Sequence, residues 1–228
     1  QMGLGTQVVM MLTLLVASKG VAAVPRASLV VLASTCAQFG LKVEWIATIL
    51  SVDAVMDMAR TTVNVLGNCM ASVVVAKWAL IGRSRPGQRP LWSCWCSRWD
   101  FVYVLWEFLA RPLLEHLEGT LFLPWYLRAM GVRVGRRVVL GAGFAQVVDP
   151  DMMVLEDGVT VEGYFQAHSF EDRVFKMDRV FVRRGATVAA GSVLFYGADV
   201  GEGARVAPHG VVMKNERLLP YGEYVGCP

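Results

Sequence analysis

The chain has 228 residues, of which 55% are hydrophobic, and its mean hydropathy is +0.45. This composition predicts a membrane part joined to a soluble part. The net charge of +3 is too small to favour nucleic acid as a partner. The cysteines form an odd set without a zinc-type spacing, which argues against a disulfide framework and against a metal site: they are Cys36, Cys69, Cys94, Cys96 and Cys227.

Two short apolar runs, 8–17 and 29–37, flank the stretch SKGVAAVPRAS near the start of the chain. Each run is shorter than the about 20 residues that a helix needs to cross a bilayer. Gly20 and Pro25 interrupt helical pairing between the runs, which is tolerated at membrane depth only where the backbone faces a cavity or a ligand. The sequence therefore predicts a re-entrant helical hairpin.

A longer apolar segment, 45–78, is long enough for one tilted transmembrane helix. It contains the stretch DAVMDMARTTVNVLGN, whose polar residues recur every three or four positions. At about 100° per residue they share one helical face: Asp53, Asp57, Arg60, Asn64 and Asn68. Charges within a membrane are costly, so we expect them either to pair as an internal clamp or to face a substrate path.

Basic residues follow this segment, and no acidic residue occurs before Asp100. By the positive-inside rule they predict that the helix ends in the cytoplasm, with an ordinary basic loop as the alternative: they are Lys77, Arg83, Arg85, Arg89 and Arg98. The aromatic stretch 99–114 is short and contains Pro112. It predicts an interfacial helix that anchors the β-helix to the membrane surface, rather than a second membrane span.

The stretches SKGVAAVP, DAVMDMARTTVNVLGN and VVVAKW resemble the second re-entrant hairpin and last transmembrane helix of dicarboxylate/amino acid:cation symporters, the glutamate transporter family. This resemblance covers nearly all of residues 1–78 and implies a location in the cell inner membrane. It implies that a small acidic substrate binds through its amino group to Asp57, through its distal carboxylate to Arg60 and through its α-carboxylate to Asn64, beside Thr61. A guanidinium suits such a carboxylate because it can donate bidentately.

The same resemblance implies a coupling ion, Na⁺ or H⁺, held by hairpin carbonyls and by asparagines: Ser18, Lys19, Val21, Asn64 and Asn68. Asn68 stands where sodium-binding members usually have aspartate, which favours proton coupling. Arg26 stands where family members usually have a glycine at the hairpin tip, and this change affects the expected gating motion of the hairpin. The rest of the substrate site is expected to precede Gln1.

From Val182 the sequence repeats every six residues. This period is typical of a left-handed parallel β-helix with inward aliphatic side chains. Shorter pieces at 134–140 and 155–161 extend the pattern upstream. The aliphatic positions are Val182, Val188, Leu194, Val200, Val206 and Val212, and small residues follow the first five: Ala186, Ser192, Ala198, Ala204 and Gly210.

Two histidines are candidates for a general base, because many such β-helices are acyltransferases that use histidine toward a hydroxyl or amine. His168 is the stronger candidate, since Glu171 and Asp172 follow it closely and are expected to orient its imidazole. His209 is expected to be a surface residue of a coil. A structural loop role for His168 is the alternative, because fold alone does not establish catalysis.

The stretches WALIGRSRPGQRPLWS, LPWYLRAMGVRVG and HSFEDRVFKMDRV, with the closing VGCP, resemble the membrane-associated terminal domain of poly-ε-lysine synthetase-like non-ribosomal peptide synthetases. This resemblance covers residues 78–228. It implies aminoacyl transfer from acyl-CoA or a carrier-bound acyl donor, with a carrier protein as partner. Both resemblances imply a homotrimer.

The sequence thus predicts a symporter-like hairpin and transmembrane helix at 1–78, a basic linker and interfacial helix at 79–130, and a left-handed β-helix at 131–228. Its expected partners are membrane lipid, a small acidic substrate and the upstream transporter portion. Three hypotheses stay open. The chain is part of a symporter site fused to a cytoplasmic acyltransferase-like domain, or it is a membrane-anchored aminoacyl or acyl transferase. The third hypothesis is an inactive fusion or assembly product, because the two resemblances meet at Lys77 and Trp78.

Overall fold

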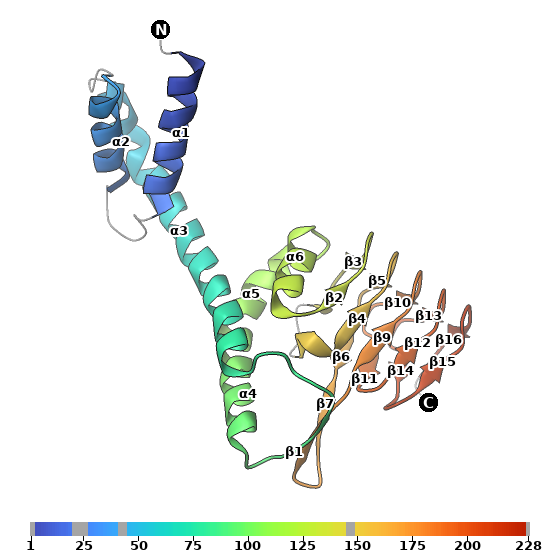
Figure 1. The fold of residues 1–228 in the computed structure, drawn as a ribbon. Coiled ribbons are helices and arrows are strands. Elements are labelled where there is room, and N and C mark those ends of the chain that lie inside the picture. Colours follow the sequence, from blue (N-terminus) through green and yellow to red (C-terminus); the bar gives the residue numbers. More distant parts are fainter. Residues whose placement is uncertain (1–2, 20–26, 41–44, 145–148, 227–228) are drawn as a thin grey trace. The chain divides into compact units, whose positions relative to one another are not determined.

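The computed structural model describes the chain except for residues 1–2, 20–26, 41–44, 145–148 and 227–228 (Figure 1). The chain divides into two compact units, residues 1–69 and 70–228, and the boundary falls within helix α3. Each unit has its own architecture.

The first unit is helical. It contains α1 (Leu4–Lys19), α2 (Ala27–Gln38) and the beginning of α3 (Trp45–Leu80), and α1 packs against α2. With 16 and 12 residues, the two arms are too short to cross a bilayer singly, as the apolar runs predicted. The expected tip of the hairpin, including Gly20, Val21, Pro25 and Arg26, lies outside the described residues.

Helix α3 has 36 residues. Within the described part of the chain, its portion Val55–Leu80 is the one segment long and apolar enough to cross a membrane by length and composition. Its last turns belong to the second unit, where Val73 is fully buried and Lys77 is 2% exposed. The long helix predicted for this region is therefore confirmed.

The second unit continues with a helical run. After strand β1 (Gly87–Pro90) come α4 (Cys94–Leu105), a π-helical turn (Trp106–Ala110), α5 (Arg111–Leu114) and a 3₁₀ turn (Glu115–Leu117), followed by α6 (Phe122–Met130). The helical run passes through Pro112 without a break. A proline lacks an N–H and crowds the carbonyl four residues earlier, and the wider π turn just before Pro112 accommodates both defects.

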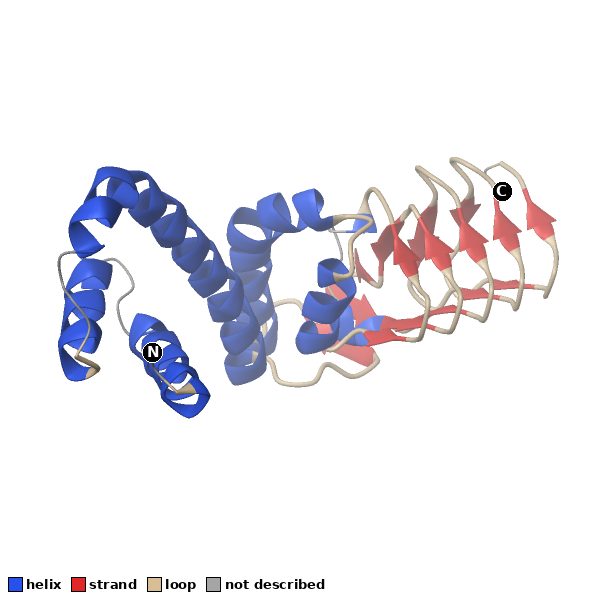
Figure 2. Ribbon diagram, turned by 90° about the horizontal axis from the view of Figure 1, so that it is seen from above, coloured by secondary structure: helices blue, strands red, loops and turns tan. Residues whose placement is uncertain are grey.

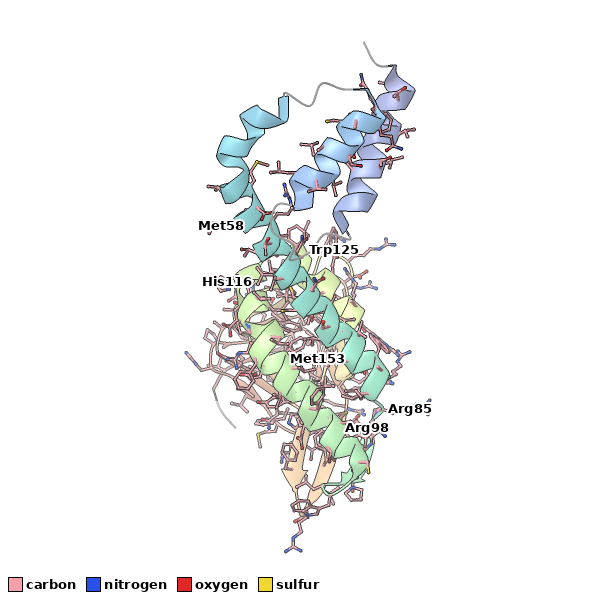
Figure 3. All side chains as sticks on the ribbon, turned by 90° about the vertical axis from the view of Figure 1, so that its left-hand side faces the viewer. Met58, Arg85, Arg98, His116, Trp125 and Met153 are labelled. Atoms are coloured by element: carbon pink, nitrogen blue, oxygen red, sulfur yellow. The ribbon has the colours of Figure 1, made fainter. Side chains whose placement is uncertain are left out.

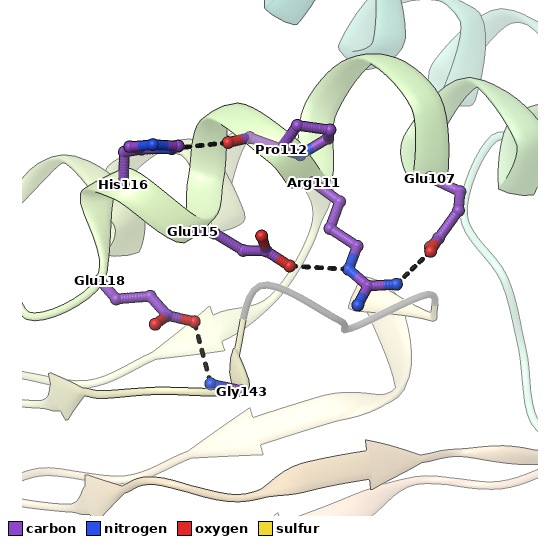
Figure 4. Close-up of polar contacts among 7 residues, drawn as sticks. All are labelled: Glu107, Arg111, Pro112, Glu115, His116, Glu118 and Gly143. Atoms are coloured by element: carbon purple, nitrogen blue, oxygen red, sulfur yellow. Dashed lines mark hydrogen bonds and ion pairs between the residues drawn. The ribbon is translucent and has the colours of Figure 1, made fainter.

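Polar contacts fasten this helical run (Figure 4). Arg111 donates from Nε to Glu115 at 2.9 Å and also pairs with Glu107, one turn away on the other side. Glu118 accepts from the backbone N–H of Gly143 at 2.9 Å. The end of the run is thereby tied to the loop that follows strand β3.

A parallel β-helix forms the rest of the second unit, as the six-residue period predicted (Figure 2). Its short strands stack into three parallel sheets, one for each face of the coil, with orders β16-β13-β10-β5-β3, β14-β11-β6 and β15-β12-β9-β4-β2. Val200 pairs with Val182 and Leu218, each three hexapeptides away. The strands are β2 (Arg133–Val134), β3 (Val139–Leu140), β4 (Met153–Leu155), β5 (Thr160–Val161), β6 (Tyr164–Gln166), β9 (Val180–Val182), β10 (Thr187–Val188), β11 (Val193–Phe195), β12 (Asp199–Val200), β13 (Arg205–Val206), β14 (Val211–Val212), β15 (Arg217–Leu218) and β16 (Glu223–Tyr224).

The predicted inward residues form the core of this coil. All six aliphatic positions are at most 2% exposed, and the small positions 186, 192, 198 and 204 are completely buried. The buried hydroxyl of Ser192 donates to the carbonyl of Ala207 at 2.9 Å, so its polarity is satisfied. A small side chain at this position leaves room for the inward aliphatic ones.

One hairpin leaves the coil between β6 and β9. It consists of β7 (His168–Glu171) and β8 (Val174–Met177), and strand β1 extends it to an antiparallel sheet by pairing with β8. Part of the region expected to be only a basic linker is thus a strand of this sheet. The hairpin brings His168 against helix α4.

Candidate active site

His168 begins the excursion hairpin and is 9% exposed. Aromatic rings enclose its imidazole: Phe175 stacks on it with centroids 5.3 Å apart, and Trp99 of α4 meets it edge-on at 4.9 Å. Strand β7 alternates its faces, so Phe170 lies on the same side as His168, at 5.2 Å. These contacts fix the position of the ring.

Asp149 orients this imidazole. Its Oδ2 lies 2.5 Å from Nδ1 of His168, and its Oδ1 accepts a hydrogen bond of 2.8 Å from Nε1 of Trp99. Asp149 is 5% exposed and precedes the 3₁₀ turn η4 (Pro150–Met152). Because a carboxylate only accepts, Nδ1 carries the hydrogen and Nε2 is the nitrogen left for a substrate.

The expected orienting roles of Glu171 and Asp172 are wrong. Residues three apart on a strand point to opposite faces, so Glu171 lies away from His168 and pairs with Lys176 at 3.0 Å and with Lys214. Asp172 sits in the turn of the hairpin with a positive φ of 54° and a side chain that is 90% exposed. Proximity in the sequence therefore indicated the wrong carboxylates as partners of this imidazole.

A cleft of about 480 Å³ opens beside His168. Aromatic side chains dominate its wall, with one carboxylate and one amide among them. The lining residues are Trp99, Asp100, Tyr103, Tyr164, Phe165, Gln166, His168, Phe170 and Val193. A mostly apolar cleft with a few polar groups is typical of small-molecule sites.

His209 occupies a corner of the coil, as expected for a surface residue. It is exposed and has a positive φ of 59°. Its side chain covers Gly191 in the neighbouring coil, where an added Cβ would lie 2.6 Å from Nδ1 of His209. The position of His209 at a corner of the coil therefore explains its exposure and its contact with Gly191. His209 does not line the cleft beside His168.

The polar face of α3 lies in the first unit. Asp57 and Arg60 form an ion pair of 3.6 Å, and Thr61 and Asn64 are half-buried. The Arg60 side chain is 39% exposed, yet its Nη1 is buried and lacks a hydrogen bond among the described residues. All four predicted substrate residues thus share one helical face, together with Asn68, which is exposed.

Most of the predicted cation ligands lack a described backbone or side chain. Val21 lies outside the described residues, and the side chains of Ser18, Lys19 and Asp53 are not described. Ser18 and Lys19 end helix α1. A cation site at the hairpin stays a prediction.

The fold defines a membrane-type helical segment joined to a hexapeptide-repeat β-helix. Residues 1–78 match the Sodium:dicarboxylate symporter family. Over 77 residues, 34% of this chain, the sequence is 56% identical to the proton/glutamate-aspartate symporter of Bacillus subtilis (strain 168), of which it covers 19%. The first part of the chain is therefore similar to one segment of these symporters.

A larger part of the chain is similar to a different protein. The delta-poly-L-ornithine synthetase of Acinetobacter baumannii (strain AB307-0294) is 32% identical over 163 residues, which are 70% of this chain and 12% of that protein. The crystal structure of serine acetyltransferase from Brucella abortus strain S19 aligns with 71% of this chain and with 70% of its own chain. The sequence identity is 16% and the TM-score is 0.26, so this likeness carries no argument about function. The chain thus combines a segment similar to symporters with a hexapeptide-repeat domain similar to a synthetase, and it spans less than a fifth of either relative.

Proposed function

We propose that the second unit is an acyltransferase in which His168 is the general base toward an amine acceptor. The observation that carries this proposal is the buried pair of His168 and Asp149 at the edge of an aromatic cleft. An oriented imidazole with one free nitrogen is the group that acid–base catalysis near neutral pH requires. The similarity to delta-poly-L-ornithine synthetase supports aminoacyl groups as the cargo.

In the proposed reaction the donor is a thioester of coenzyme A or of a carrier protein. The acceptor nitrogen attacks the thioester carbonyl, so that a C–N bond forms and the C–S bond breaks. Nε2 of His168 removes a proton from the attacking nitrogen and returns it to the departing thiolate. Asp149 holds the imidazole in the required tautomer and stabilises the imidazolium that forms between these transfers.

The test is transfer from ornithyl-pantetheine, or from acetyl-CoA, to L-ornithine by the full chain in detergent micelles. His168→Ala is expected to lower the rate about 10²- to 10⁴-fold. His209→Ala is the matched control, because that histidine lies outside the cleft, and it should leave the rate unchanged. Full turnover by His168→Ala would overturn the proposal.

The orienting carboxylate gives a second comparison. Asp149→Asn is expected to lower the rate strongly, because an amide can donate to Nδ1 and favour the wrong tautomer. Glu171→Gln, which changes the carboxylate first expected to orient the histidine, should have little effect. The reverse ranking would contradict the assignment of Asp149.

We propose further that α3 crosses the inner membrane with the turns that precede the second unit, and that the second unit lies in the cytoplasm. Exposed arginines follow the helix, among them Arg85 and Arg98 (Figure 3), as the positive-inside rule requires. Exposed aromatic side chains on the helical run and α6, such as Phe108 at 74% and Trp125 at 61%, suit the membrane surface.

Cys94 offers a direct test of this topology, because it is exposed. A membrane-impermeant maleimide should label it in inverted membrane vesicles and not in intact cells. Cys94→Ser removes this labelling and controls for the other cysteines. Labelling of Cys94 in intact cells would place the second unit on the opposite side.

A second candidate function belongs to the first unit: Asp57, Arg60, Thr61 and Asn64 form part of a site for an acidic amino acid or dicarboxylate, coupled to Na⁺ or H⁺. The Asp57–Arg60 pair supports it, because at 3.6 Å it leaves the guanidinium able to donate to a carboxylate. The test replaces the matching segment of the Bacillus subtilis symporter with residues 1–78. Aspartate uptake by this hybrid should be lost with Arg60→Ala and kept with Val63→Ala on an exposed face, whereas unchanged uptake by Arg60→Ala would end the assignment.

A further inference from the structure

A second buried carboxylate lies two residues after the one that orients His168. Asp151 is in turn η4, and its Oδ2 lies 2.7 Å from Nζ of Lys77 and accepts a hydrogen bond of 2.8 Å from the backbone N–H of Ser84. The two charged side chains are 3% and 2% exposed. The pair is therefore almost completely removed from water.

Gly131 also lies against this ion pair, and it caps the C-terminus of α6 with a φ of 114°. A Cβ at this position would lie 2.1 Å from Oδ1 of Asp151 and 3.2 Å from Nζ of Lys77. Three segments distant in sequence, namely the end of α3, the end of α6 and turn η4, thus meet at one ion pair.

Turn η4 connects this ion pair to the candidate base. Asp149 and Asp151 flank Pro150, and the backbone N–H of Met152 closes the turn on the carbonyl of Asp149 at 3.0 Å. The carboxylate of Asp149 meets His168 and Trp99, while that of Asp151 meets Lys77 and Ser84. A short rigid turn therefore carries two carboxylates with separate partners.

We infer that Lys77 is a positioning residue for His168: its ion pair with Asp151 anchors turn η4 so that Asp149 faces the imidazole. Lys77 lies at the end of the segment that matches the symporter family, whereas Asp151 lies outside that segment. The end of helix α3 thus helps to position the residues of the candidate site in the β-helix. This inference rests on the proposed acyl transfer for its functional meaning, but its geometry can be tested without turnover.

The experiment uses the full chain in micelles with ¹⁵N-labelled histidines, of which there are three. NMR of the native chain should show His168 with its proton fixed on Nδ1. Lys77→Met should broaden or remove this signal and give mixed tautomers at His168, while the signals of His116 and His209 stay unchanged. Lys214→Met, which removes a lysine from the exposed pair with Glu171, is the matched control and should preserve the His168 signal.

Two further variants keep the inference testable if Lys77→Met fails to fold. Asp151→Asn keeps the volume of the side chain, and Gly131→Ala changes no charge but drives a methyl group into Asp151. Both are expected to disturb His168 in the same way, and to lower kcat by up to about 100-fold at an unchanged KM for the acceptor. Folded variants that all retain the native His168 signal would overturn the inference.

The two proposals fail in different ways. If Lys77→Met disturbs the His168 tautomer while His168→Ala retains turnover, the positioning role stands and the acyltransferase assignment falls. If His168→Ala abolishes turnover while the Lys77, Asp151 and Gly131 variants leave both the tautomer and kcat unchanged, the positioning role falls.

Discussion

The two units use apolar residues in opposite ways. In the second unit the inward aliphatic residues of the hexapeptides are almost completely buried, in contact with one another and with the helices. In the first unit large apolar side chains such as Met11, Val30, Met58 and Val63 are between 67% and 72% exposed. The second unit has a core of its own, whereas the described part of the first unit offers its apolar surface to an environment outside itself.

This contrast is the one expected between a coil that folds around its own core and a segment that faces lipid or the rest of a transporter. A bilayer does not drive apolar side chains together, so a membrane segment has no need to bury them within itself. Ion pairs follow the same division, since Lys77–Asp151 is enclosed and Asp57–Arg60 is partly exposed. Substitutions at matched sites in the two units therefore test this contrast.

The largest difference is expected between the two ion pairs. Lys77→Ala leaves the carboxylate of Asp151 buried and unpaired, and should cost the second unit about 3–5 kcal/mol of unfolding free energy. Asp57→Ala breaks a partly exposed pair whose long arginine side chain can still reach a polar environment, and should cost less than Lys77→Ala. Thermal and denaturant unfolding of the full chain in micelles measures both, and equal costs would remove the distinction.

The apolar cores give the next largest difference. Leu194→Ala removes a fully buried side chain from the coil and should cost about 2–5 kcal/mol. Met58→Ala, at a site 72% exposed in the first unit, should change the unfolding free energy by less than about 0.5 kcal/mol. A large cost at Met58 would show that the first unit has a core of its own.

A smaller effect is expected at Tyr126, which fastens α6 to α3 by donating from its hydroxyl to the carbonyl of Met70 at 3.0 Å. Burial raises the pKa of this hydroxyl, so the folded chain keeps a proton that the unfolded chain releases near pH 10. The second unit should consequently lose stability as the pH rises above about 10. Tyr126→Phe should cost about 0.5–1.5 kcal/mol at neutral pH and flatten this alkaline loss; an unchanged pH dependence would contradict the assignment.

The smallest effect is expected at the surface of the helical run. The hydrogen bonds that Arg111 donates to Glu115 and Glu107 raise the pKa of its guanidinium, but its side chain is 29% exposed. Arg111→Ala should therefore cost only about 0.2–1 kcal/mol, and this cost should shrink at high salt. Unfolding at low and high ionic strength measures it, with the exposed Arg217→Ala as control.

Patterns with a short period were readable from the sequence. The six-residue repeat identified the inward side chains from Val182 to Val212, and the polar spacing along α3 placed Asp57 and Arg60 on one face. The parallel β-helix, the long helix and the two short hairpin arms were predicted for the same reason. Each depends on residues a few positions apart.

Contacts between distant segments escaped prediction. Strand β1 carries no clear strand pattern and exists because β8 offers an edge. Asp149 belongs to an irregular insertion, and the only sequence hint was a DPD motif between two coils. The burial of Lys77 gave no signal at all, because a lysine at the end of an apolar helix ordinarily reaches toward water.

Local spacing was enough to predict the periodic elements and the inward residues of the coil, because it decides which side of a strand or helix a residue occupies. The carboxylate that meets His168 and the partner of Lys77 depended on tertiary packing. Those partners are brought together by the loop around η4, the excursion hairpin and the end of α3, whose approach depends on packing rather than on spacing along the chain.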